Sequence, residues 1–235
     1  MAKLYVIAGH GAGDPGACGN GYQEAERVRA LASRMKALGG SNVEVLDTSR
    51  NWYADNGISK LSIPSDAFLV ELHMDSATAS ARGGHVIIYG GYDADDYDKA
   101  LAKFISGYFP GRSTTISKRT DLANPNRAAQ RGINYRLLET CFISNASDIS
   151  KFNSNIDEVA KGILGAFGIS VTTTTNTSTS KKDEVLSMDK KELATTIWGY
   201  TNTNFEKVDA YQILRDIRDA VVRIEKEVQA LKEAK

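Results

Sequence analysis

Three residues with metal-binding side chains stand at or just after the ends of strand-like runs in this 235-residue chain. His10 ends a strand-like apolar run, Glu24 follows it across a glycine-rich loop, and His73 ends a later apolar run. Two imidazoles and one carboxylate around a tetrahedral Zn²⁺ leave a fourth position open, which is typical of catalytic zinc sites. A histidine at a strand end is more often a hydrogen-bonded packing residue, so residue types and spacing leave both interpretations open.

The elements that must position these residues alternate between strand and helix. Short apolar runs predict strands over 3–9, 42–47, 67–74, 84–90 and 134–143. Apolar residues at helical spacing predict helices over 22–38, 95–107 and 155–167. This alternation is typical of an α/β domain with a largely parallel central sheet flanked by helices. Ligands collect at the carboxyl ends of strands in such sheets, so His10 and His73 could share one rim.

Four blocks of the sequence resemble, in order, those of the zinc-dependent N-acetylmuramoyl-L-alanine amidases of the amidase-3 type. They read "AGHGAGDPGACGNGYQE", "VELHMDSA", "ARGGHVIIYG" and "LLETCFISNASD", and together they cover residues 4 to about 168. The resemblance implies that His10, Glu24 and His73 are the ligands of Zn²⁺. It also implies that Glu139 is the catalytic carboxylate.

The chain departs from the family's motifs at several positions near these residues. Asp75 stands where the family often has Asn, Glu71 where it often has Ser, and Cys141 where it usually has Gly. With Cys18 in the ligand loop, Cys141 raises the hypothesis of a redox switch, against the simpler interpretation of two small buried side chains. His85 matches no metal position, and we expect it to be a satisfied strand residue.

The resemblance implies a reaction on bacterial peptidoglycan. The family cuts the amide between N-acetylmuramic acid and L-alanine, with Glu139 as general base toward a zinc-activated water and as proton donor to the leaving amine. Two alternatives remain open at this stage. The chain could be a non-catalytic peptidoglycan-binding protein that retains the amidase fold, or a zinc peptidase that acts on the stem peptide.

Composition excludes some other classes of protein. Lys+Arg and Asp+Glu both number 29, so the chain lacks the basic excess that is usual in nucleic-acid binders. No apolar run approaches the roughly 20 residues that a membrane-spanning helix needs, so we expect no membrane insertion. Two cysteines do not make a disulfide framework.

The composition changes abruptly near Ser170. Residues 170–182 are mostly Ser and Thr and predict a flexible linker between a catalytic domain, 1–169, and a small helical C-terminal region, 183–235. Apolar residues repeat at steps of four and three from Ala210 to Leu231. This heptad pattern predicts a coiled coil and a possible homo-oligomer. The alternatives are internal packing in a small bundle and a wall-binding module.

The N-terminal residues "MAKLYVIAGHG" lack the long apolar stretch of a signal peptide. Together with a murein amidase domain and a linked tail, this favours a phage-type endolysin. We then expect the protein to be made in the host cytoplasm and to reach the cell wall after holin-type release.

Overall fold

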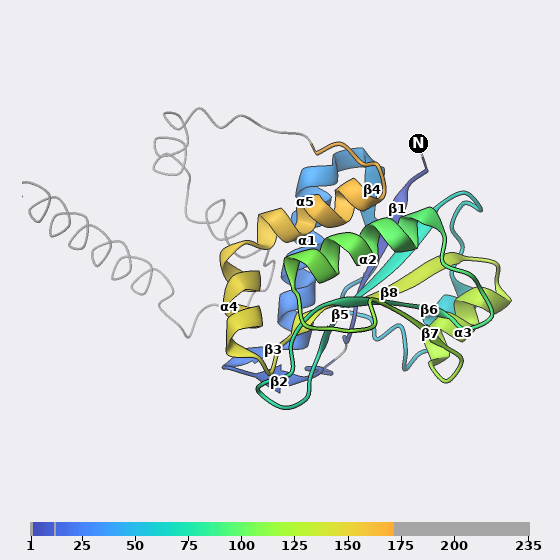
Figure 1. Ribbon diagram of the computed structural model, residues 1–235. Coiled ribbons are helices and arrows are strands. Elements are labelled where there is room, and N and C mark those ends of the chain that lie inside the picture. The colour runs from blue at the N-terminus through green and yellow to red at the C-terminus, as the bar shows by residue number, and fades with distance from the viewer. Residues whose placement is uncertain (1, 12, 172–235) are drawn as a thin grey trace, which may run out of the picture. The chain divides into compact units, whose positions relative to one another are not determined.

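The computed structural model describes residues 2–11 and 13–171. The C-terminal region 183–235 and nearly all of the expected linker 170–182 therefore lie outside the described residues. Six strands form one sheet in the order β4-β1-β5-β8-β6-β7, and helices flank it (Figure 1). The predicted α/β fold is confirmed.

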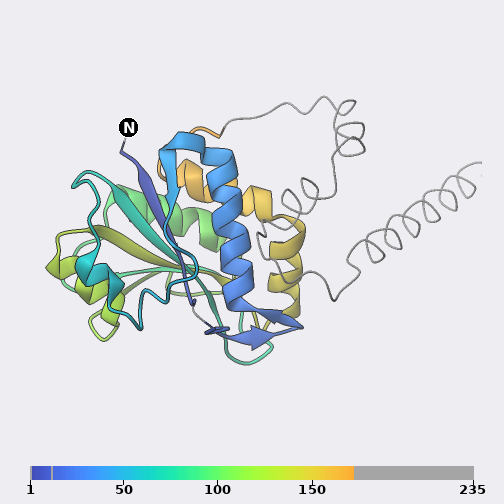
Figure 2. The ribbon, with the colours of Figure 1, turned by 180° about the vertical axis from the view of Figure 1, so that it is seen from behind.

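The strands of the central sheet are β1 (Leu4–Ala8), β4 (Val43–Val45), β5 (Phe68–Asp75), β6 (His85–Tyr89), β7 (Ile116–Arg119) and β8 (Asn134–Phe142). The helices are α1 (Glu24–Gly39), α2 (Asp96–Tyr108), α3 (Ala123–Gln130), α4 (Ala146–Ser154) and α5 (Ile156–Ala166). Two short 3-10 helices are η1 (Gly40–Asn42) and η2 (Gly57–Lys60). A small hairpin of β2 (Cys18–Gly19) and β3 (Tyr22–Gln23) lies beside the start of α1, at the bottom of Figure 2.

Strand direction divides the sheet into two parts. β4, β1, β5 and β8 run parallel, whereas β6 runs antiparallel to β8 and carries β7 parallel to itself. The segment 76–84 between β5 and β6 is too short for the helical crossover that parallel strands need, so β6 returns in the opposite direction. The start of β6 therefore lies at the same rim as the ends of β5 and β8.

Two apolar clusters cover the two faces of the sheet. The larger one packs α1, α2 and α5 against alternate strand residues such as Val6, Leu72 and Leu138. The smaller one, on the opposite face, joins residues such as Leu69 and Leu137 to the η2 and α3 segments. Because successive strand residues point to opposite faces, the neighbours of Leu72 in sequence, Glu71 and His73, lie on the second face.

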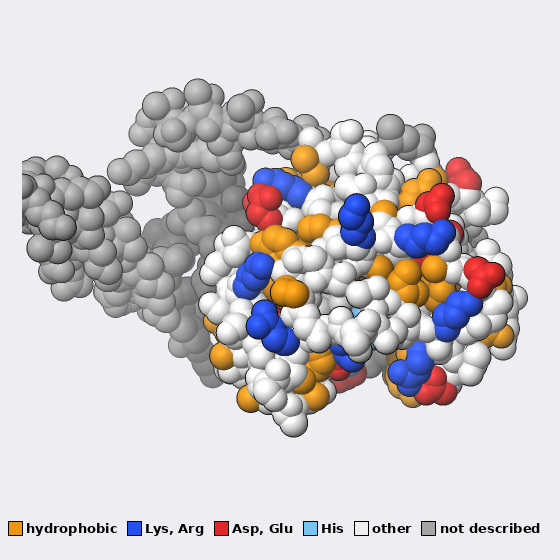
Figure 3. Space-filling model, viewed as in Figure 1, with side chains coloured by type: hydrophobic (Ala, Val, Ile, Leu, Met, Phe, Trp, Pro, Cys, Tyr) orange, Lys and Arg blue, Asp and Glu red, His pale blue; other side chains and the backbone are white. Residues whose placement is uncertain are grey.

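Charged side chains of both signs are interspersed over the face shown in Figure 3. No helix among the described residues has the length and apolar character needed to cross a membrane.

Candidate metal centre and active site

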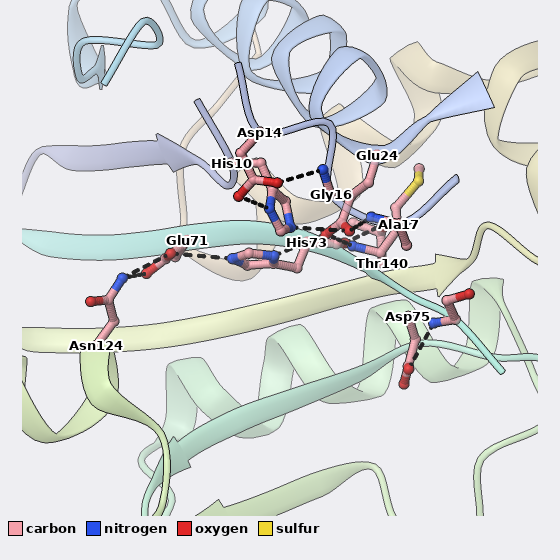
Figure 4. Close-up of polar contacts among 12 residues, drawn as sticks. His10, Asp14, Gly16, Ala17, Glu24, Glu71, His73, Asp75, Asn124 and Thr140 are labelled. Carbon is pink, nitrogen blue, oxygen red and sulfur yellow. Dashed lines mark hydrogen bonds and ion pairs between the residues drawn. The ribbon is translucent and has the colours of Figure 1, made fainter. Parts of the chain in front are cut away.

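The three candidate metal ligands converge at the rim of the sheet (Figure 4). Glu24, the first residue of α1, lies between the two imidazoles, with Oε2 3.1 Å from His10 Nε2 and Oε1 2.9 Å from His73 Nδ1. One ligand atom from each residue lies within 4.8 Å of the others. Such a group of two nitrogens and one carboxylate can hold a metal ion.

Glycine lets the loop bring His10 and Glu24 this close. Gly16 has a φ of 65°, and a Cβ there would lie 2.7 Å from His10 Cδ2 and 2.8 Å from Glu24 Oε2. A side chain at this position would therefore push both ligands aside, in addition to adopting a backbone conformation that L residues rarely take. His10 itself has a φ of 60°, so the loop holds this ligand in the same uncommon conformation.

Backbone N–H donors fix the carboxylate of Glu24, a residue that is only 3% exposed. Ala17 N donates to Oε2 at 3.0 Å and Met74 N donates to Oε1 at 2.9 Å. Burial opposes ionisation of Glu24, but its hydrogen bonds with His10 and His73 outweigh burial and lower its pKa. The carboxylate therefore stays ionised, as a metal ligand must be.

Each histidine has a second carboxylate on its other ring nitrogen. Asp14 Oδ2 lies 2.9 Å from His10 Nδ1, and Glu71 Oε1 lies 3.2 Å from His73 Nε2. Burial lowers the pKa of both imidazoles, but the surrounding carboxylates outweigh it and raise each pKa, most strongly for His73. A carboxylate behind a histidine is the usual arrangement around protein-bound metals, since it fixes the ring's tautomer and orientation.

Glu139 lies directly opposite His73 in the β5–β8 register, and Thr140 Oγ1 donates to the His73 carbonyl at 3.0 Å. The Oε2 atom of Glu139 is buried and has no hydrogen-bond partner among the described residues. Burial raises the pKa of Glu139 to about 7; the charge of His73 opposes this rise and that of Glu24 adds to it. A carboxyl group with such a pKa can accept and release a proton near neutral pH.

His85 occupies the position of β6 that pairs with Glu139. It is 6% exposed, and within the described part of the chain its buried Nδ1 has no hydrogen-bond partner. Burial lowers its pKa, with a further contribution from the charge of Arg119. The buried Nδ1 therefore does not fit the expectation that His85 is a satisfied strand residue.

The residues that depart from the family motifs have distinct surroundings. Asp75 forms an ion pair with Arg112, whose guanidinium lies over the Phe142 ring. Cys141 is fully buried and its burial raises the thiol pKa, whereas Cys18 is exposed. Only Cys141 thus fits the interpretation of a small buried side chain, and the redox hypothesis stays a prediction.

A cavity of about 260 Å³ adjoins the ligands on the second face of the sheet. The residues that line it include Glu71 and Leu137 of the sheet, with Trp52, Tyr53 and Pro125. His10 and His73 also line it, so a bound molecule would have both apolar surface and the candidate metal ligands within reach.

Sequence reasoning missed the roles of Asp14 and of the Asn124 and Tyr135 side chains behind Glu71. Asp14 carried a local signal, because it stands four residues after His10 in a tight glycine loop. Asn124 and Tyr135 carried none, since they approach Glu71 from distant segments of the chain.

Comparisons with known proteins show the family of this chain. Residues 4–170 match the family model described as N-acetylmuramoyl-L-alanine amidase. The chain is 33% identical over 183 residues to the probable autolysin PH of Staphylococcus aureus, covering 70% of this chain and 38% of that protein. The chain thus spans well under half the length of this relative.

Solved structures share the fold at lower identity. The catalytic domain of the CD27L endolysin targeting Clostridia Difficile superposes with a TM-score of 0.56 at 17% identity, covering 73% of this chain and 100% of that one. The amidase AmiC2 of Nostoc punctiforme gives a TM-score of 0.53 at 21% identity, covering 71% and 94%.

Proposed function

Since the chain belongs to the N-acetylmuramoyl-L-alanine amidase family, we propose that it hydrolyses the amide between N-acetylmuramic acid and L-alanine in bacterial peptidoglycan. The observation that carries this proposal is the convergence of His10, Glu24 and His73 at one rim, with Glu139 opposite His73. Two imidazoles and one carboxylate, with further carboxylates behind both rings, are a donor set that suits Zn²⁺.

In this proposal His10, Glu24 and His73 would hold Zn²⁺, and the ion would supply a water of lowered pKa and polarise the amide carbonyl. Glu139 would accept a proton from the attacking water at its unpartnered Oε2 and release it to the leaving amine nitrogen. In the metal-free protein burial raises the pKa of Glu139 to about 7, and a group that binds a proton and then gives it up needs a pKa near the working pH. Trp52 and Tyr53 line the adjoining cavity, where they would offer apolar surface to a bound substrate.

The test compares wild type with Glu139→Gln on purified Gram-positive cell walls, with zinc content measured for both proteins. We expect wild type to clear the walls and to release new L-alanine amino termini. We expect Glu139→Gln to keep its zinc and to lose activity by about 10²- to 10⁴-fold, the usual contribution of a general acid–base group. Glu26→Gln is the matched control, because Glu26 lies exposed in the first turn of the same helix as Glu24.

Two results would replace this proposal. If wild type binds zinc and walls but clears no wall type, the chain is a peptidoglycan-binding protein that retains the fold. If the stem peptides are shortened and no intact stem is released, the chain is a zinc peptidase acting on the stem.

We further propose that the chain serves as a phage-type endolysin, made in the host cytoplasm and acting at the wall after holin-type release. The relative named an autolysin supports the competing role in bacterial wall turnover. Expression of the full chain in a Gram-positive host separates the two. An endolysin leaves cells intact until the membrane is permeabilised, whereas an autolysin that is exported lyses or thins the wall without permeabilisation.

The role of residues 170–235, most of which lie outside the described residues, remains a proposal. We propose that 170–182 links the catalytic domain to a region, 183–235, that binds the wall or forms a homo-oligomer. Light scattering and wall sedimentation of the full chain, compared with a chain ending at Ile169, test both roles. If truncation changes neither the number of chains in each particle nor the binding to walls, both proposed roles are wrong.

A further inference from the structure

We propose that Glu71 is the positioning residue of His73, holding the Nε2 side of the ring so that Nδ1 is presented to the metal. This inference rests on the zinc site of the proposed function and assigns a role to a residue outside the ligand set.

The first observation is the placement of the His73 imidazole between two carboxylates. Glu71 Oε1 lies 3.2 Å from Nε2, and Glu24 Oε1 lies 2.9 Å from Nδ1 on the opposite side of the ring. Glu71 and His73 are two residues apart in β5, so both side chains leave the same face of a rigid central strand. Figure 4 shows this row, with Glu71 between His73 and Asn124.

The second observation is how firmly Glu71 itself is held. Asn124 Nδ2 lies 3.0 Å from both carboxylate oxygens, and the Tyr135 hydroxyl donates to Oε2 at 2.6 Å. Asn124 is fixed in turn, because its Oδ1 accepts from Arg127 at 2.9 Å. Glu71 is only 3% exposed, and a carboxylate is buried at acceptable cost only when such donors satisfy it. The network thus fixes both oxygens, and the one beside His73 can move little.

The third observation is the difference between the two outer carboxylates. The side chain of Asp14, behind His10, is 41% exposed, whereas the side chain of Glu71 is 4% exposed. Asp14 accepts hydrogen bonds from Gly16 N and Asn51 Nδ2. It stands in an exposed part of the glycine loop, where water can replace a lost contact. The Glu71 side chain is far less exposed, so water replaces a lost contact less readily behind His73, and Glu71 should matter more for metal affinity than Asp14 does.

The test measures the zinc dissociation constant of the full-length protein by competition with a chromophoric chelator. Glu71→Gln removes the charge and keeps the size, and we expect it to weaken zinc binding by about 10- to 100-fold, as loss of an outer partner usually does. Tyr135→Phe is the matched control, because it removes a donor to the same carboxylate without touching His73. We expect it to lower the melting temperature of the metal-free protein and to change zinc affinity far less.

A second readout follows the ring directly. In NMR spectra of the zinc-loaded wild type, the His73 Nε2 proton should resonate at low field because it is hydrogen-bonded to a carboxylate, and Glu71→Gln should move that resonance upfield, because an amide oxygen is a weaker acceptor. The inference is overturned if Glu71→Gln binds zinc as wild type does, or if both variants lose affinity in proportion to their loss of stability. If wild type binds no zinc, the proposed function fails and takes this inference with it. If wild type binds zinc and only the Glu71 result is negative, the proposed function stands alone.

Discussion

The two faces of the central sheet use the same strands for different purposes. In β5, Val70, Leu72 and Met74 point into the larger apolar cluster, while the alternate residues Glu71 and His73 point to the opposite face. The first face, called the packed face below, is covered by α1, α2 and α5. On the second face, the candidate ligands meet at the rim of the sheet. A single strand therefore adds only to the apolar core on one side, whereas on the other it adds Leu69 to the smaller core and Glu71 and His73 to the chemistry.

The packed face also contains a buried charged side chain, that of Arg136. Arg136, in β8, is 1% exposed and shares its face with Leu138. Its guanidinium donates to Asp98 at 2.8 Å and to Asp95 at 3.0 Å. It also lies over the rings of Phe68 and Phe167. The packed face thus holds a buried ion pair of Arg136 with Asp98, toward the opposite end of the strands from the metal ligands.

Arg136→Met should have the largest effect on stability, because it leaves the buried carboxylate of Asp98 without its partner. Breaking a buried ion pair in this way typically costs about 3–5 kcal/mol. Urea unfolding of the full chain measures the loss. A loss below about 1 kcal/mol, the range of exposed ion pairs, would show that water reaches Asp98 and that the burial of this ion pair is only apparent.

Leu72→Ala tests the packed face beside the ligands. Leu72 is fully buried between Glu71 and His73 in sequence, and its truncation should cost about 2–5 kcal/mol of unfolding free energy. Its side chain points away from the metal ligands, so we expect zinc affinity to stay near that of wild type. A large fall in zinc affinity would break the comparison, because it would couple the two faces through the strand.

The pH dependence of stability tests the chemical face. Glu139 has its pKa raised from 4.5 to about 7 by burial, so the folded state binds its proton more tightly than the unfolded state. This contribution is fully present below pH 4.5 and is lost as the pH rises through 7, at a cost of at most about 3 kcal/mol.

Glu139→Gln removes that cost. In metal-free protein the variant should match wild type near pH 4.5 and exceed it in stability at pH 8.5, as measured by urea unfolding at both values. The reverse order at pH 8.5 would mean that the ionised carboxylate is stabilised by its surroundings, which would weaken its case as a proton carrier.

Local sequence patterns predict much of the fold and several of the residues at the rim of the sheet. The apolar run of β5 ends in His73, and strand alternation places Glu71 on the same face, so the strand and its chemistry are readable together. The pattern also predicted β1, β8 and the long amphipathic helix α1, whose bounds in the structure lie close to the predicted ones.

The elements that the sequence did not predict have weak local signals. β7 reads "ISKR" at the sheet edge, with two of its four residues exposed. α3 contains a proline and two asparagines, which are poor helix formers. The direction of β6 depends on which strand it pairs with, and the Asn124 contact to Glu71 joins residues far apart in the chain. Such long-range pairing has no signature in a single sequence.

Asn145 gives the smallest expected effect, at the point where the packed face meets the rim. Its side chain caps α4 by accepting from Ser147 N at 3.0 Å and Asp148 N at 3.1 Å, and it donates to Ala79 O at 2.8 Å. Asn145→Ala should cost about 1 kcal/mol, the usual loss for an N-cap. Asn145→Asp keeps an acceptor for both cap hydrogen bonds and replaces the donor to Ala79 O with an oxygen that cannot donate.

Comparing these two variants by urea unfolding separates the cap from the loop contact. If Asn145→Asp retains nearly the full stability, the cap dominates, and α4 serves the packed face through Ile149 and Phe152. If both variants lose stability equally, the contact to Ala79 dominates. The loop behind the rim would then depend on a residue of the packed side, and the two faces would be less independent than the alternation of β5 implies.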